Sequence, residues 1–271
     1  MSTVVVDGGW LARRLGSAGL RIVEAAHDSA PYDAAHIPGA VYVDWRRDLL
    51  ARGDESAGHV IGPESFAGLM GRLGIGPSDT VVCYGDEGGR HAIRFLWTLE
   101  YYGHRRFHFL DGGRERWQAD GRPMTAVPPV IEPVDYPVSS VGAPGIRASW
   151  QDVLAAVERK DATLLDVRTR AEYERWDVRA ARGGRIPGAV WTEWTQALAE
   201  DQRLRPVEEL RRLYAFAGVE PHRPVITYCQ LGVRAAHTWF VLKHVLGYRD
   251  VRNYDGSWRE WGDRQGLPVE K

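Results

Sequence analysis

One cysteine of this chain stands where a thiol could act as a nucleophile. Cys229 follows the apolar run PVITY (224–228) and opens the turn CQLGVR, which Arg234 closes before a helical pattern over 234–246. Loop amides and a helix N-terminus at such a junction favour the thiolate, the reactive form of cysteine, and the guanidinium adds a full positive charge. The spacing therefore predicts a catalytic Cys229 at the start of an anion-binding loop whose substrate-binding residues are Gln230, Leu231, Gly232, Val233 and Arg234.

The alternative interpretation of Cys229 is a small buried hydrophobic residue at a strand end, which is what free cysteines commonly are. The second cysteine, Cys83, lies inside the apolar run TVVCY (80–84) and is expected to be structural. Two cysteines cannot build a disulfide framework or a four-thiolate zinc site. Each is therefore expected to be a free thiol, and no metal centre is expected.

The chain repeats itself, so the chemistry of its two halves can be compared. The string IPGAV occurs at 37–41 and again at 186–190. Farther along, a shift of 144 residues aligns the halves without a gap and pairs Tyr84 with Tyr228, Arg90 with Arg234, Asp111 with Asp255, Gly112 with Gly256 and Trp117 with Trp261. In this alignment Gly85 stands opposite Cys229, so only the second half is expected to carry the nucleophile.

A proline-rich stretch marks the joint between the halves. Six of the fifteen prolines fall between residues 123 and 144. Such a run cannot be helical and is typical of an extended linker. The sequence therefore predicts a first domain over 1–123, a linker over 124–145 and a second domain over 146–271.

Within each half, short β-rich runs alternate with helical patterns. Strands are expected at 21–25, 80–84, 107–110, 163–167, 224–228 and 251–254, and helices at 64–73, 90–102, 149–158, 206–217 and 234–246. Ser149 is expected to cap the helix over 149–158. The alternation predicts an α/β fold, a parallel sheet with helices on both faces in each half. Ligands bind such sheets beyond the carboxyl ends of the strands, where Cys229 lies.

Composition excludes some classes of partner. The chain has 271 residues and a formal net charge of −1, which argues against a nucleic-acid partner. No run of 18 apolar residues and no basic start followed by an apolar segment occurs. We therefore expect no membrane partner, no signal peptide and a cytoplasmic protein.

The ordered set of motifs resembles that of tandem-domain rhodaneses, the thiosulfate and 3-mercaptopyruvate sulfurtransferases. The segments that carry this resemblance cover essentially the whole chain: both IPGAV strings, FLDGGRERW (109–117), LLDVRTRAEY (164–173), CQLGVR (229–234) and YDGSWREW (254–261). The resemblance implies two tandem rhodanese-like domains. It also implies that the amino-terminal domain is inactive and has lost its cysteine, which agrees with Gly85 opposite Cys229.

The resemblance further implies a double displacement of sulfur. The Cys229 thiolate would attack the outer sulfur of a donor such as thiosulfate, and cyanide or a thiol would then take that sulfur from the Cys229 persulfide. Loop amides would stabilise the persulfide charge, and the kinetics would be ping-pong. The expected partners are a small-molecule sulfur donor and a thiophilic acceptor, with no cofactor, because the cysteine itself carries the sulfur.

Alternatives differ in donor, acceptor or chemistry. Mercaptopyruvate enzymes of this family usually carry a Cys-Gly-Ser/Gly-Gly-Val-Thr loop, whereas a loop that begins Cys-Gln and ends in Arg resembles some bacterial thiosulfate enzymes and favours thiosulfate. A cysteine phosphatase would need five residues between Cys and Arg, and the residue at that place is Ala235. A sulfur-relay protein would pass the persulfide sulfur to a protein acceptor. Retention of Cys229 argues against a purely protein-binding module.

Four further side chains are candidates with a competing structural interpretation. Arg234 is expected to grip the sulfonate of the donor, or else to tie the loop to a carboxylate. Arg168, by resemblance, is expected near the site, with an ion pair to Asp166 or Glu172 as the alternative. Trp194 is expected to line the pocket or to pack as Trp45 does in the first half. His59 lies where similar mercaptopyruvate enzymes have a histidine, and is otherwise a loop residue.

Overall fold

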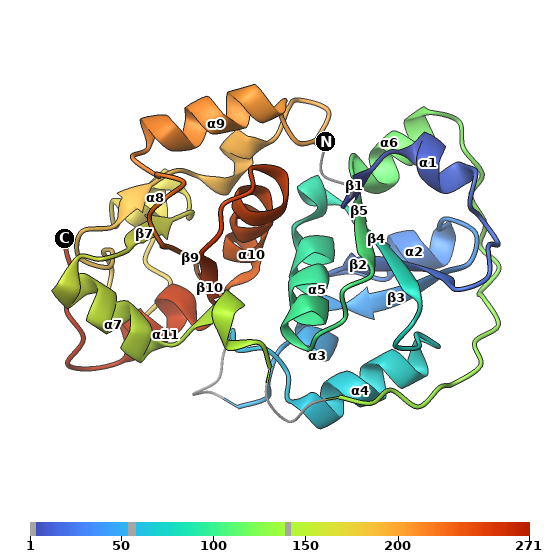
Figure 1. Ribbon diagram of the computed structural model, residues 1–271, viewed down its shortest axis with the longest axis horizontal. Coiled ribbons are helices and arrows are strands. Elements are labelled where there is room, and N and C mark those ends of the chain that lie inside the picture. The colour runs from blue at the N-terminus through green and yellow to red at the C-terminus, as the bar shows by residue number, and fades with distance from the viewer. Residues whose placement is uncertain (1–3, 54–57, 139–141) are drawn as a thin grey trace. The chain divides into compact units, whose positions relative to one another are not determined.

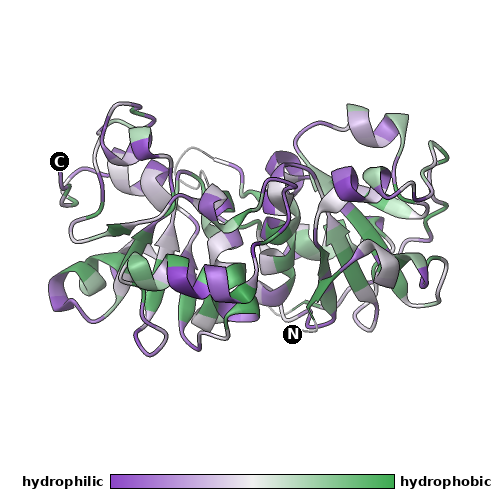
Figure 2. Cartoon of the chain, turned by 90° about the horizontal axis from the view of Figure 1, so that it is seen from above, coloured by the Kyte–Doolittle hydropathy of each residue, from purple (hydrophilic) through white to green (hydrophobic). Residues whose placement is uncertain are grey.

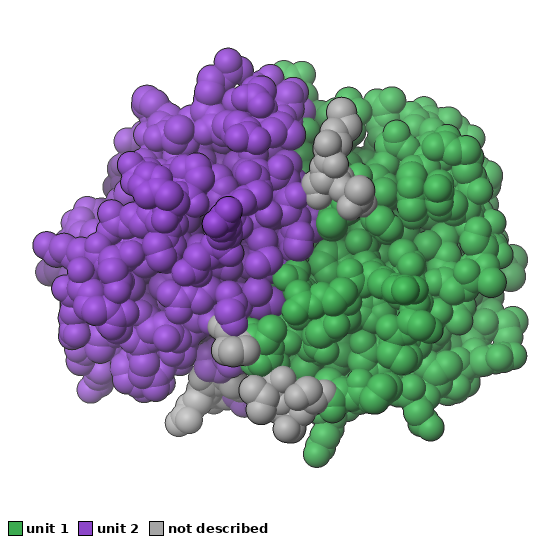
Figure 3. Space-filling view, in the orientation of Figure 1, with its two compact units in different colours: residues 1–50, 61–143, 200–204 green, residues 51–60, 144–199, 205–271 purple. Residues whose placement is uncertain are grey.

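A computed structural model describes residues 4–53, 58–138 and 142–271 of the chain. The chain forms two compact units, each made from more than one stretch of sequence (Figure 3). Unit 1 comprises residues 1–50, 61–143 and 200–204, and unit 2 comprises residues 51–60, 144–199 and 205–271. Most of the expected linker groups with unit 1, and the domain boundaries 1–123 and 146–271 stay a prediction.

Each unit is built on a five-stranded parallel sheet (Figure 1). In unit 1 the strand order is β1 (Val5–Val6), β5 (Phe107–Leu110), β4 (Thr80–Tyr84), β2 (Leu20–Ala26) and β3 (Ala40–Asp44). In unit 2 it is β6 (Arg147–Ala148), β10 (Val251–Tyr254), β9 (Val225–Tyr228), β7 (Thr163–Asp166) and β8 (Val190–Trp191). The two orders correspond strand for strand, which confirms the predicted pair of α/β sheets.

Helices follow the strands in the same way in both halves. Unit 1 contains α1 (Gly8–Ala12), α2 (Ala30–Ala34), α3 (Trp45–Leu49), α4 (Pro63–Arg72), α5 (Arg90–Tyr101) and α6 (Gly113–Ala119). Unit 2 contains α7 (Trp150–Arg159), α8 (Arg170–Tyr173), the 3₁₀ turn η4 (Trp194–Ala197), α9 (Val207–Phe216), α10 (Val233–Phe240) and α11 (Ser257–Asp263). The predicted helix over 234–246 continues past α10 as a π-helical turn, Val241–Val245.

Alternate side chains of the central strand β9 serve the two faces of the sheet, as a period of two requires. Ile226 and Tyr228 join a buried core with α7 and α11, which includes Trp258 and Trp261. Thr227 faces the opposite side, where its hydroxyl donates to the carbonyl of Ala235 in α10 at 3.0 Å. The central strands β4, β7 and β9 are accordingly almost entirely buried, and green, hydrophobic segments run through the sheets in Figure 2. Both faces of the sheet are therefore packed, and a ligand is expected to bind at the carboxyl ends of the strands.

Local signals in the sequence account for two features that fix this scaffold. Ser149 caps α7 as expected, because its hydroxyl accepts from the N–H of Asp152 and the Asp152 carboxylate accepts from the N–H of Ser149. The IPGAV strings serve both units alike: the N–H of Ile37 donates to the Tyr84 hydroxyl at 3.1 Å, and the N–H of Ile186 donates to Tyr228 at 3.2 Å.

Candidate active site

Cys229 lies at the carboxyl end of β9, at the start of the loop that leads into α10. Cys229 is buried, with 1% of the residue exposed. Gly232 provides the turn into the helix with a φ of 72°, a left-handed conformation that glycine adopts without strain. The first N–H groups of a helix have no partner within it, so the amino end of α10 offers positive partial charge beside this loop. The thiol thus stands at the strand–helix junction that the sequence predicts.

A serine that follows the last strand holds the backbone of the nucleophile. The N–H of Cys229 donates to Ser257 Oγ at 3.0 Å, and the Ser257 hydroxyl donates to the carbonyl of Tyr254 at 2.7 Å. The N–H of Trp258 donates to the Cys229 carbonyl at 2.9 Å. Ser257 is fully buried and has a φ of 53°, which costs a non-glycine residue energy. Both backbone groups of Cys229 are therefore fixed from α11.

Other hydrogen bonds hold the rest of the loop. The Gln230 amide donates to the carbonyl of Arg179 at 2.7 Å, and the N–H of Arg259 donates to the Gln230 carbonyl at 3.1 Å. Asn253 Nδ2 donates to the Gly232 carbonyl at 3.1 Å. Leu231 is half-buried and Val233 is buried. These bonds occupy loop carbonyl oxygens, whose negative partial charge would otherwise oppose an anion.

Arg234 is tied to a buried carboxylate, the structural role that the sequence left open. Its Nη1 and Nη2 lie 2.6 and 2.8 Å from the two oxygens of Glu172 in α8. Burial alone would raise the pKa of Glu172, but the hydrogen bonds and charge of Arg234 lower that pKa to about 2. Burial would lower the pKa of Arg234, but its hydrogen bonds to Glu172 and electrostatic interactions with Cys229 and Glu172 raise that pKa above its ordinary value. Both terminal nitrogens of Arg234 are thus engaged by Glu172, and the grip on a donor sulfonate stays a prediction.

Arg168 forms the ion pair with Asp166 that the sequence left as the alternative. Its guanidinium bonds Asp166 through Nε at 3.0 Å and Nη2 at 2.6 Å, and the carbonyl of Gly184 through Nη2 at 2.8 Å. The residue is 1% exposed, and its guanidinium carbon lies 4.5 Å from the ring centre of Trp258. This geometry favours the structural interpretation, and a role of Arg168 in substrate binding stays a prediction.

Trp194, like its counterpart Trp45 in the first half, packs against a histidine ring, although the ring geometry differs. It begins η4, is 6% exposed, and meets His237 edge-to-face with ring centres 5.1 Å apart. In unit 1, Trp45 stacks on His91 at 5.2 Å. Because a tryptophan–histidine contact occurs in the unit without the nucleophile as well, this geometry favours packing for Trp194, and its role in lining the substrate pocket stays a prediction.

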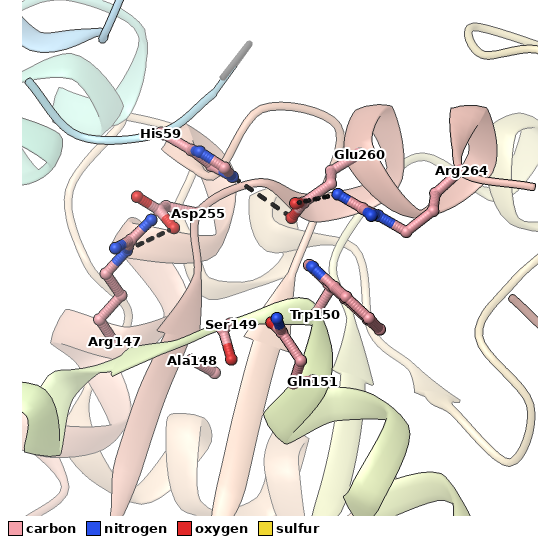
Figure 4. A pocket seen from close by; sticks show the side chains of 9 residues that line it. All are labelled: His59, Arg147, Ala148, Ser149, Trp150, Gln151, Asp255, Glu260 and Arg264. Atoms are coloured by element: carbon pink, nitrogen blue, oxygen red, sulfur yellow. Dashed lines mark hydrogen bonds and ion pairs between the residues drawn. The ribbon is translucent and has the colours of Figure 1, made fainter. Parts of the chain in front are cut away.

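His59 belongs to unit 2 although it comes from the first half of the sequence. Its Nε2 lies 3.3 Å from Glu260 Oε2, as Figure 4 shows. The two line a pocket of about 390 Å³ beside the carboxyl ends of β6 and β10, together with Arg147, Ala148, Ser149, Trp150, Gln151, Asp255 and Arg264. Cys229 is not among these lining residues. The structure therefore places His59 in unit 2, which also contains Cys229, and pairs it with a carboxylate.

The equivalent loop of unit 1 lacks both the thiol and the room for one. A Cβ added to Gly85 would lie 2.5 Å from the carbonyl oxygen of Ala25, closer than real Cβ atoms come to such a group. Asp86 and Glu87 follow Gly85, and Arg90 pairs with Glu87. An anion would thus meet carboxylates here. Cys83 is buried within β4, as expected, and burial raises its pKa well above the ordinary value.

Three residues that hold the loop were missed as site residues from the sequence: Ser257, Glu172 and Asn253. Ser257 had a usable signal, because the shift of 144 residues places it opposite Gly113. Gly113 has a φ of 52°, almost that of Ser257, and a Cβ there would collide with the carbonyl of Gly85. The two units therefore differ at a contacting pair of positions, Cys229 with Ser257 against Gly85 with Gly113.

Within the described ranges, no group of three or more His, Cys, Asp or Glu residues could hold a metal ion. None of the helices described there is both long enough and apolar enough to span a bilayer.

Comparison with known proteins agrees with this geometry. A family model for the rhodanese-like domain matches residues 7–120 and again residues 149–264. The thiosulfate sulfurtransferase of Corynebacterium glutamicum is 42% identical over 275 residues, which cover 98% of this chain and 90% of that protein. The sulfur carrier protein TtuD of Thermus thermophilus is 39% identical over 280 residues, covering 99% and 96%.

Solved structures extend the similarity to the fold. The anaerobic ergothioneine biosynthesis enzyme from Chlorobium limicola, in complex with its natural substrate trimethyl histidine, superposes with a TM-score of 0.88 at 25% identity. The match covers 99% of this chain and 70% of that one. With two matches to one family model, a duplicated sheet and near full-length relatives, the chain belongs to the rhodanese family and carries two rhodanese-like domains in tandem.

Proposed function

We propose that the chain is a sulfurtransferase that moves the outer sulfur of thiosulfate to cyanide or a thiol through a persulfide on Cys229. The observation that carries this proposal is the fixed thiol at the junction of β9 and α10, opposite a glycine in the duplicated unit. The names of the relatives, thiosulfate sulfurtransferase and sulfur carrier protein, support sulfur transfer.

The reaction consists of two displacements. The Cys229 thiolate attacks the outer sulfur of thiosulfate; a bond from Sγ to that sulfur forms, the sulfur–sulfur bond of thiosulfate breaks, and its electron pair leaves with sulfite. Cyanide or a thiolate then attacks the outer sulfur of the persulfide, and the electron pair of the broken bond returns to Cys229 Sγ. Sulfur is only exchanged between nucleophiles, so no external oxidant or reductant is consumed.

The residues around Cys229 supply position and charge. Ser257 and Trp258 hold the backbone of the nucleophile, and the amino end of α10 favours the negative charge on the thiolate and on the persulfide. Arg234 adds positive charge near the sulfur while Glu172 holds it in place. Preorganised dipoles, more than a free cation, would therefore stabilise the anionic intermediate.

Three alternatives differ from this proposal in chemistry, donor or acceptor. A phosphatase would need an arginine at residue 235, and the residue at that place is Ala235, which is fully buried. 3-Mercaptopyruvate is the second candidate donor because His59 belongs to the catalytic unit. Its pairing with Glu260 gives it a structural partner, which favours thiosulfate. A protein acceptor in place of cyanide is supported by the sulfur carrier relative.

Steady-state kinetics test this proposal. Initial rates measured against thiosulfate at several fixed cyanide concentrations should give parallel double-reciprocal lines, the signature of a ping-pong mechanism. Intersecting lines would contradict the persulfide cycle. Parallel lines obtained only with 3-mercaptopyruvate would change the donor and leave the role of Cys229 intact.

A further inference from the structure

A short segment from the first half of the sequence lies against the loop 229–234, which begins at Cys229 and is called the catalytic loop below. The chain leaves unit 1 after Leu50 and returns to it at Ile61, and residues 51–60 group with unit 2 (Figure 3). The part of this segment described next to the loop is Gly58–Val60. It is closed on itself by the N–H of Ala51, which donates to the carbonyl of His59 at 2.8 Å.

Gly58 contacts the loop so closely that no side chain fits. Its φ is 96°, a conformation that favours glycine. A Cβ built there would lie 2.7 Å from the carbonyl oxygen of Asp255 and 3.4 Å from the Cα of Leu231, two residues after the nucleophile. The neighbouring atoms are main chain, so they cannot move aside as a flexible side chain would.

Val60 and His59 hold the segment on the turn that follows β10. The N–H of Val60 donates to Asp255 Oδ2 at 2.8 Å, and the residue Asp255 is 1% exposed. His59 lies over Gly256, where an added Cβ would come within 2.7 Å of its Nε2. The next residue in the chain is Ser257, the partner of the Cys229 N–H. The segment therefore touches the loop at Leu231 and also the turn that supports Cys229.

Unit 1 has the matching hydrogen bond to an aspartate, but not the close backbone contact that Gly58 makes. The N–H of Leu204 donates to Asp111 Oδ1 at 3.0 Å, and these two residues align with Val60 and Asp255 at the shift of 144. The residue opposite Gly58 is Gln202, which also has a positive φ, of 62°, yet is exposed and carries a side chain. Only the segment beside the loop with the nucleophile is packed too tightly for a Cβ.

We propose that Gly58–Val60 is a positioning segment, which sets the conformation of the catalytic loop at Leu231 and of the turn at Asp255–Ser257. Sulfur transfer at Cys229 would then depend on three residues from the other half of the sequence. This inference rests on the proposed function. Its distinguishing prediction is a loss of rate that exceeds any loss of stability.

The first test is Gly58→Ala, with Gly188→Ala as the matched control. Both glycines have positive φ in unit 2, at 96° and 75°, but Gly188 has no atom within 4 Å of an added Cβ. The single-turnover rate of persulfide formation from thiosulfate should fall about 10- to 100-fold in Gly58→Ala, since a small misplacement of reacting groups has effects of that size. The rate of Gly188→Ala should stay within about twofold of the wild type, because it suffers backbone strain without displacement.

The second test removes the carboxylate that accepts the Val60 N–H in unit 2 or the Leu204 N–H in unit 1. It also covers the case in which Gly58→Ala fails to fold. Asp255→Ala should slow persulfide formation, Asp255→Asn should recover part of the rate because its amide oxygen still accepts the Val60 N–H, and Asp111→Ala should leave the rate unchanged. Asp255 also pairs with Arg147, whose Nε lies 2.9 Å from Asp255 Oδ1. Arg147→Ala removes this ion pair but keeps the Asp255 carboxylate, so it controls for the loss of the ion pair.

Rates are compared per folded molecule, with thermal unfolding measured on the same samples. A normal rate in Gly58→Ala and Asp255→Ala would overturn the proposal, as would equal losses in Gly188→Ala and Asp111→Ala. Absence of persulfide in the wild type would instead overturn the proposed function. The two failures are therefore distinguishable.

Discussion

At the scale of single residues, the difference between the two units lies in a contacting pair. Where unit 2 has Cys229 and Ser257, unit 1 has Gly85 and Gly113. The position of Cys229 at a strand–loop–helix junction could be predicted from the sequence, because internal duplication makes an unmatched cysteine there conspicuous. The role of Ser257 could not, because its buried hydroxyl acts on a backbone N–H 28 residues away in sequence, a contact without a local pattern.

Restoring a cysteine to unit 1 is not expected to restore a second site. Gly85→Cys would place its Cβ 2.5 Å from the Ala25 carbonyl, beside Asp86 and Glu87. In a Cys229→Ala background, we expect Gly85→Cys to form no persulfide with thiosulfate and to lower the melting temperature. Detection of a sulfur adduct on that protein by intact mass would show that the loop of unit 1 can still hold the intermediate.

Replacing Ser257 separates its hydrogen bond from its backbone conformation. Ser257→Ala and Ser257→Gly both lose the acceptor for the Cys229 N–H, so both should slow sulfur transfer. Ser257→Gly should be more stable than Ser257→Ala by roughly 1 kcal/mol, because glycine tolerates the φ of 53°. Chemical denaturation and single-turnover kinetics on the two variants check this order. Equal rates in the wild type and both variants would remove Ser257 from the site.

At the scale of elements, the central strands and long helices follow from apolar runs and periodicity, but the edge strands do not. Three of the four edge strands, β1, β6 and β8, have two residues each, too few for an alternating pattern to be visible. The fourth, β3, has five residues and is not among the strands expected from the sequence. Ion pairs were the structural alternative for both arginines of the site: Asp166 or Glu172 for Arg168, and a carboxylate for Arg234. The structure pairs Arg168 with Asp166 and Arg234 with Glu172, and both acids are buried.

The ion pair of Arg234 with Glu172 joins α10 to α8 and should contribute to stability. Arg234→Ala leaves a carboxylate buried without its cation, which commonly costs roughly 3–5 kcal/mol of unfolding free energy. Adding Glu172→Gln should recover part of that loss, because the unpaired charge is then removed. Urea denaturation of the single and double variants is the measurement. An unchanged midpoint in Arg234→Ala would mean that the pair does not support the fold.

The same pair predicts a pH dependence. The pKa of Glu172 is about 2 in the fold, below its ordinary 4.5. Its contribution is therefore complete above pH 4.5 and is lost as the pH falls toward 2. The stability difference between the wild type and Glu172→Gln should shrink across that window. A difference that stays constant in this range would contradict the assigned shift.

At the scale of the whole molecule, duplication predicts two similar units, but not the segments that they exchange. Residues 51–60 group with unit 2 and residues 200–204 with unit 1. Asp111 and Asp255 look like turn residues in the sequence, since each precedes a glycine. The partners of their carboxylates, Leu204 and Val60, come from the other half of the sequence, and no periodicity or local motif reports such a contact.

Ionisation of Asp111 should lower the stability of unit 1, to which residues 200–204 are attached through the Leu204 N–H. Burial raises the pKa of Asp111 to about 6, against an ordinary 3.8. A raised pKa means that the folded form holds the proton more firmly, so the contribution of Asp111 to stability is complete below pH 3.8 and is lost as the pH rises through about 6. Asp111→Asn keeps an oxygen for the Leu204 N–H without the charge. Its stability relative to the wild type should therefore increase over this range, as pH-dependent denaturation can show; a flat difference would refute the shift.

The central claim is that Cys229 carries sulfur as a persulfide, and intact-mass spectrometry tests it most directly. The protein is incubated with thiosulfate, measured, and then treated with cyanide. We expect a gain of one sulfur atom that cyanide removes and that Cys229→Ala does not show. No gain with thiosulfate or with 3-mercaptopyruvate, or an equal gain in Cys229→Ala, would contradict it.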